Sequence, residues 1–62
     1  MSEEVEARIR KLRHDLANPL AAILAETQMM LLAADQYDEE TVTSLKEIEK
    51  LARRMRDMLR DA

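Results

Sequence analysis

Apolar residues recur at steps of three and four along two long stretches of the chain. In the first stretch they form one stripe of an α-helix with 3.6 residues per turn, and its members are Val5, Ile9, Leu12, Leu16, Leu20, Ile23, Thr27, Met30 and Ala34. The second stretch has a broader stripe, with Leu45, Ile48, Ala52, Met55 and Leu59 at its centre and Val42, Leu51 and Met58 on its flanks. The pattern predicts two amphipathic helices.

A short polar segment separates the two stretches and contains a helix start. Asp38 precedes two glutamates, and an aspartate in this place caps the first free N–H groups of a helix. Ser2, also followed by two glutamates, gives the first helix a similar start. We therefore expect helices over about residues 3–34 and 39–60, joined by a turn at about 35–38.

The apolar stripes are wider than two helices need to cover each other. A hairpin of 62 residues also buries too little surface to offset the entropy lost on folding. The simplest way to cover the remaining stripe is a two-fold copy of the same hairpin. The sequence thus predicts an all-α fold, in which an antiparallel helical hairpin homodimerises into a four-helix bundle, with residues 1–62 as a single domain.

Composition and charge exclude several classes of function. The chain has no Gly, no Cys, a single His and a formal net charge of −3. These values argue against a phosphate-binding loop, a metal site and a nucleic-acid partner. The longest apolar runs, residues 20–25 and 29–34, are far shorter than the roughly 20 residues needed to cross a bilayer. We expect a cytoplasmic segment without membrane contact.

The side of the first helix opposite the apolar stripe carries an unusual set of residues. His14 lies almost diametrically opposite the stripe and is therefore expected to face solvent. The strip that continues from His14 has small or apolar side chains where a solvated surface would carry charges, and it comprises Asn18, Ala21, Ala25, Met29 and Leu32, with Ala22 at its edge. Such a strip is typical of a surface that another molecule contacts.

A proline lies in the interior of the first predicted helix. Pro19 cannot donate a hydrogen bond to the carbonyl of Asp15, and its ring crowds that carbonyl. We therefore expect the helix to be deformed close to its single imidazole.

The segment from His14 to Leu20, with the sequence HDLANPL, resembles a known motif. It is similar to the H-box of the dimerisation and histidine-phosphotransfer (DHp, or HisKA-type) domain of two-component sensor histidine kinases. In that motif, His is followed by an acid, then by Thr or Asn four positions after the His, and then by Pro-Leu. Asp15 stands where many members have Glu, and Ala17 stands where a basic residue is common.

The resemblance implies a role for each residue of the motif. His14 would accept the γ-phosphoryl group of ATP and pass it to an aspartate of a response-regulator receiver domain. Asp15 would act as general base or orient the imidazole, Asn18 would position a water for phosphatase activity, and Pro19 would kink the helix. A receiver domain that reaches His14 must also cover the neighbouring strip, where we expect it to contact Ala21, Ala22, Ala25 and Met29.

The resemblance also implies which partners and cofactors the chain needs. We expect the chain to bind no cofactor itself, because ATP and Mg²⁺ belong to a separate ATP-binding domain that it lacks. The expected partners are a second copy of the chain, that ATP-binding domain and a receiver domain. Two alternatives remain, namely a stand-alone histidine phosphotransfer protein and a purely structural dimerising hairpin.

Overall fold

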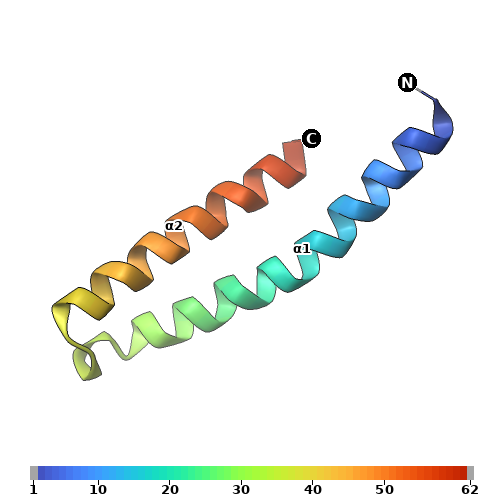
Figure 1. Ribbon diagram of the computed structural model, residues 1–62. Coiled ribbons are helices and arrows are strands. Elements are labelled where there is room, and N and C mark those ends of the chain that lie inside the picture. The colour runs from blue at the N-terminus through green and yellow to red at the C-terminus, as the bar shows by residue number, and fades with distance from the viewer. Residues whose placement is uncertain (1, 62) are drawn as a thin grey trace.

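The computed structural model describes residues 2–61 and consists of two long helices joined by a short turn. Helix α1 spans Glu3–Leu32, a 3₁₀ turn (η1) spans Ala34–Gln36, and α2 spans Glu39–Asp61. The two helices run antiparallel, side by side (Figure 1), and give an elongated molecule with extents of 51 × 14 × 12 Å. This confirms the predicted all-α hairpin. Met1 and Ala62, the ends of the expected domain, lie outside the described residues.

Side-chain caps define where each helix begins. The Ser2 hydroxyl accepts a hydrogen bond from the N–H of Val5 at 3.2 Å, and Oδ1 of Asp38 accepts one from the N–H of Thr41 at 2.7 Å. Hydrogen bonding from Thr41, through its side chain and its backbone, lowers the pKa of the Asp38 carboxyl below its usual value. Both caps are the ones expected from the sequence.

Helix α1 ends at Leu32, two residues before the end expected from the apolar pattern. The N–H of Ala33 bonds to the carbonyl of Met30 at 3.0 Å, which tightens the last turn, and residues 34–36 continue as the 3₁₀ turn. A glycine in the left-handed conformation commonly ends a helix in one step. This chain has no glycine, so the helix ends through a tighter turn instead.

Pro19 lies inside α1 without interrupting it, because the helix is continuous from Glu3 to Leu32. The helix is nevertheless bent, and its blue N-terminal part runs at a different inclination from its green part (Figure 1). The lost hydrogen bond to the Asp15 carbonyl is a sufficient cause of such a bend. The N-terminal part of α1 also extends past the C-terminal end of α2 (Figure 1).

The contact between the helices is a narrow line of small and medium-sized side chains. Buried residues are Leu20, Leu24 and Thr27 of α1 and Leu45 and Ala52 of α2, with Leu59 packed against them. The Thr27 hydroxyl donates to the carbonyl of Ile23 at 2.7 Å, so this buried polar group is satisfied. Leu24 lies outside the stripe predicted from the sequence, which means that α1 is rotated relative to that prediction.

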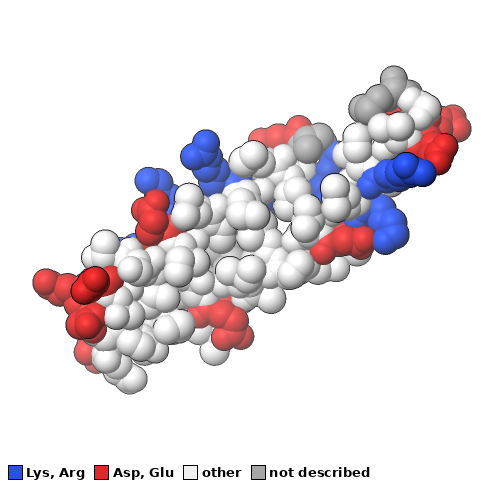
Figure 2. All heavy atoms as spheres, in the orientation of Figure 1, with Lys and Arg blue, Asp and Glu red and all other residues white. Residues whose placement is uncertain are grey.

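Much of the predicted stripe remains exposed in the single hairpin. On α1 the exposed fractions range from 37% to 59%, at Val5, Ile9, Leu12, Leu16, Ile23 and Met30. Helical spacing places four of these residues of α1 on the same side of the hairpin as the exposed apolar residues of α2. We call this surface the apolar face, and it consists of Leu12, Leu16, Ile23 and Met30 of α1 and Ile48, Leu51, Met55 and Met58 of α2. Figure 2 shows a broad area without charges over the middle of both helices.

Over the described residues, neither helix contains a stretch that is both long enough and apolar enough to cross a membrane.

Candidate functional site

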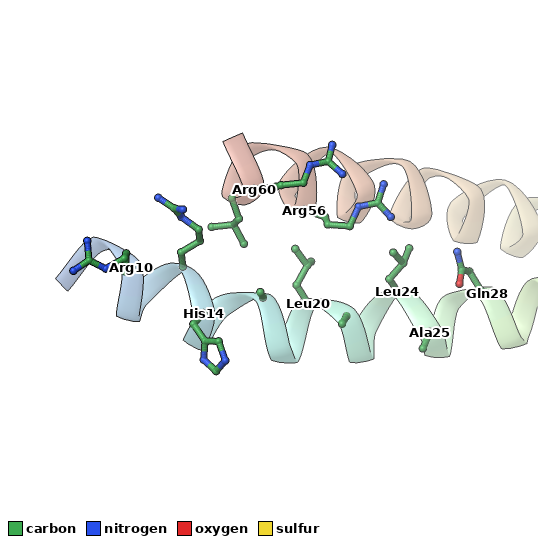
Figure 3. Close-up of a pocket in the computed structure, with 12 residues that line it drawn as sticks. Arg10, His14, Leu20, Leu24, Ala25, Gln28, Arg56 and Arg60 are labelled. Atoms are coloured by element: carbon green, nitrogen blue, oxygen red, sulfur yellow. The ribbon is translucent and has the colours of Figure 1, made fainter. Parts of the chain in front are cut away.

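His14 projects from α1 on the side that faces away from α2 (Figure 3). Its side chain is 77% exposed, so an incoming group can reach the ring from solvent. The imidazole lies about one helical turn before Pro19, close to the bend in α1. Both features correspond to what the sequence predicts for this residue.

Asp15 lies on one edge of the imidazole. Its Oδ1 is 3.8 Å from Nδ1 of His14, while its Oδ2 accepts a hydrogen bond from Nζ of Lys11 at 2.7 Å. The hydrogen bond from Lys11 is the main cause that lowers the pKa of the Asp15 carboxyl, and the nearby His14 contributes less. The same contact raises the pKa of Lys11. The carboxylate therefore stays ionised at neutral pH and faces Nδ1, and among residues 2–61 no carboxylate forms an ion pair with Nε2.

Asn18 and Pro19 complete the motif on the exposed surface of α1. Asn18 follows His14 by four residues, and side chains at this spacing are neighbours, with about 5–6 Å between their Cβ atoms. The described side chains offer Asn18 no hydrogen-bond partner, so its amide is available to an incoming group or a water. The fold thus brings His14, Asp15 and Asn18 together at one site.

A groove of about 660 Å³ runs between the two helices beside His14. Its floor is apolar and its lining contains four arginines and no acidic residue, the full set being Arg10, Arg13, His14, Ala17, Leu20, Ala21, Leu24, Ala25, Gln28, Arg56, Leu59 and Arg60. Of the residues expected to contact a partner, Ala21 and Ala25 line this groove. Ala22 and Met29 are exposed outside it.

The arginines of the groove come from both helices (Figure 3). Arg56 and Arg60 each lie near Oδ1 of Asp57, at 3.3 and 3.2 Å. Nε of Arg13 is buried and has no hydrogen-bond partner among residues 2–61. The lining thus has four cations and no carboxylate, although Asp57 and Asp61 beside the groove pair with two of these arginines.

Several residues of the site were not singled out by the sequence pattern. Lys11 lies outside both the apolar stripe and the motif, and the signal that could have found it is its spacing of four from Asp15, the usual spacing of a helical ion pair. Arg13 lines the groove because of how α1 and α2 pack, which no local pattern indicates. Leu59 belongs to the predicted apolar stripe of α2, but only the packing of the two helices places it at the groove. Within the described part of the chain, no three His, Asp or Glu side chains are grouped in a way that would hold a metal ion.

Comparison with known proteins gave one match. Residues 6–62 match the protein family described as His Kinase A (phospho-acceptor) domain. The matched range covers both helices almost completely and includes the whole segment from His14 to Leu20. A search of curated proteins and a search of solved structures found no match.

Proposed function

The chain belongs to the His Kinase A (phospho-acceptor) domain family, and from this premise we propose that it is the phosphoacceptor and dimerisation domain of a sensor histidine kinase, phosphorylated on His14. The observation that carries the proposal is the exposed imidazole, which has a carboxylate 3.8 Å from Nδ1 and, among the described side chains, no ion-pair partner at Nε2. A histidine that only supports the fold would pack against neighbouring side chains. The His14 side chain is 77% exposed instead, so the fold does not account for its position.

The geometry supports Nε2 as the nucleophile. With the proton on Nδ1 facing Asp15, the lone pair of Nε2 attacks the γ-phosphorus of ATP, the bond to the bridging oxygen breaks and ADP leaves. The Nδ1 proton is then acidic and passes to the carboxylate or to water. Because the pKa of Asp15 is lowered by Lys11, its main contribution is to orient the ring and stabilise positive charge, as the aspartate does in a serine-protease triad.

The second half of the reaction moves the phosphoryl group from Nε2 to a carboxylate oxygen of a receiver-domain aspartate. The groove beside His14 supports docking of such a partner, since small side chains at Ala21 and Ala25 allow close approach. Its arginines, with no carboxylate among the lining residues, favour a partner whose active-site surface is acidic. Asn18 would then orient the water that removes the phosphoryl group from that aspartate.

ATP and Mg²⁺ enter this scheme through a separate ATP-binding domain, and we place the reaction in the cytoplasm, where ATP is available. The test of the proposal is incorporation of labelled phosphate. The purified protein with ATP and Mg²⁺ is expected to remain unlabelled, and addition of a cognate ATP-binding domain is expected to give an acid-labile, base-stable label.

Absence of label with every ATP-binding domain supplied, combined with labelling by a phosphorylated receiver domain, would favour a stand-alone phosphotransfer protein instead. Absence of label from both donors would leave a purely structural dimerising hairpin.

The apolar face supports homodimerisation. Each large side chain in it loses about 1.5–3 kcal/mol of possible stabilisation if it stays in water rather than being buried. We expect sedimentation equilibrium to show a dimer at micromolar concentration, and Ile23→Lys, at the centre of this face on α1, to shift the protein to monomer.

Leu32→Lys is the matched control for this dimer prediction. Leu32 is 88% exposed and lies on the opposite side of α1, so the same substitution should leave the dimer intact. A folded wild-type monomer at micromolar concentration, or equal effects of the two variants, would contradict the assignment of the apolar face.

A further inference from the structure

Lys11 makes the only charged contact with the free oxygen of the Asp15 carboxylate among the described side chains. The two residues are four apart on α1, and their 2.7 Å hydrogen bond is charge-assisted and short. A second ion pair of the same kind, Arg8 with Glu4 at 2.8 Å, lies about two turns earlier on the helix and does not touch Asp15. Lys11 is thus linked to the phosphoacceptor through Asp15.

The contact between Asp15 and His14 is weakly specified by the helix itself. Successive side chains on a helix point about 100° apart, and the terminal torsion of an aspartate is broad. Toward the C-terminus, the neighbour of Asp15 at a spacing of four is Pro19, which has no N–H and no polar side chain. Asn18, at a spacing of three, forms no hydrogen bond with Asp15 in the described structure, so the cation one turn before Asp15 is the group that holds its carboxylate.

We propose, resting on the proposed function, that Lys11 is a positioning residue for phosphorylation of His14. By holding Oδ2 of Asp15, it fixes the carboxylate in the rotamer that directs Oδ1 toward Nδ1 of the imidazole. The neutral ring then keeps its proton on Nδ1 and presents the lone pair of Nε2 to the phosphoryl donor. Removing Lys11 leaves the carboxylate free to turn to solvent.

The other charged groups near His14 do not hold the Asp15 carboxylate. Arg10 and Arg13 of α1 and Arg56 and Arg60 of α2 line the groove, and none of them forms an ion pair with Asp15 in the described structure. In Figure 3, the arginines of α2 lie across the groove, whereas the His14 ring points away from that helix. The fixed orientation of the carboxylate depends on Lys11 alone.

The imidazole tautomer gives a direct test, because His14 is the only histidine of the chain and a single ring reports. The ratio of the Nδ1–H to the Nε2–H form is measured by ¹³C and ¹⁵N NMR on the dimeric protein, without ATP, at a pH where the ring is neutral. Lys11→Gln is expected to lower this ratio by a factor of about two or more, the size expected for an exposed ion pair. Lys11→Arg, which keeps a donor cation, is expected to restore it.

Arg8→Gln is the matched control, because it removes an equally exposed cation, and the ion pair it forms, from the same helix without touching Asp15. It is expected to leave the tautomer ratio unchanged. The pKa of the Asp15 carboxyl, followed in the same samples, should lie below its usual value in the wild type and rise in Lys11→Gln only.

Three outcomes would overturn the proposal. A higher Nδ1–H fraction in Lys11→Gln would show that Lys11 competes with His14 for the carboxylate rather than positioning it. Equal tautomer ratios in Lys11→Gln and Arg8→Gln would show that Lys11 does not position the carboxylate. A Lys11→Arg variant that fails to restore the wild-type tautomer ratio would show the same. A tautomer effect as expected, together with no phosphate incorporation in the assay with an ATP-binding domain, would instead reject the proposed function.

Discussion

Replacing His14 by Gln is expected to abolish incorporation of phosphate from ATP in the presence of a cognate ATP-binding domain. Glutamine offers no nitrogen lone pair of comparable nucleophilicity, so the bond to the γ-phosphorus cannot form. The chain has no other histidine and no cysteine that could take the group in its place. Label incorporation is followed by electrophoresis at neutral pH, with the acid lability of the label as a second criterion.

The fold should tolerate this change, since the His14 side chain is 77% exposed and packs against neither helix. Helicity by circular dichroism and dimerisation by sedimentation equilibrium should therefore match the wild type. Label that survives in His14→Gln would place the acceptor on another residue and remove the central claim. If His14→Gln loses both the label and the dimer, the lost label reports a folding defect. The variant His14→Asn would then be used in place of His14→Gln.

The second large effect is expected at the groove. Changing Ala25 to Arg puts a long charged side chain into a surface where Ala21 and Ala25 leave room for a partner. The new charge also joins the arginines already present there. The steric clash and the unpaired buried charge together should cost a few kcal/mol of affinity, which corresponds to about a hundredfold weaker binding of the cognate receiver domain. Binding is measured by calorimetry and stability by thermal unfolding.

Ala7→Arg is a suitable control for the groove. Ala7 is exposed and lies on the same side of α1 as Ala25, but on the other side of His14 along the helix. We expect it to leave receiver binding nearly unchanged, because the proposed docking surface extends from His14 toward the turn between the helices. Normal binding by Ala25→Arg would show that docking uses another surface, and a much lower melting temperature would show that Ala25 packs in the folded dimer.

The motif and the two helices could be predicted from the sequence because their causes are local. A cap such as Asp38 acts on N–H groups within its own turn, and a step of three or four is sufficient to place residues on one side of a helix. The exposed position of His14 follows from the same geometry. The end of α1 was less predictable, since the alanines after Leu32 suit a helix as well as a 3₁₀ turn.

The sequence by itself determined that the chain forms two amphipathic helices, that they carry more apolar surface than one hairpin can cover, and that His14, Asp15 and Asn18 share an exposed site. The tertiary structure decided which part of the broad stripe packs within the hairpin. It buries Leu24 and leaves Ile23 half exposed, because two helices meet along one narrow line and the rotation of each about its axis depends on the fit of both. That rotation also brings Arg56 and Leu59 of α2 beside Ala21 and so forms the groove. Contacts between residues far apart in the chain depend on this fit, and no local period specifies it.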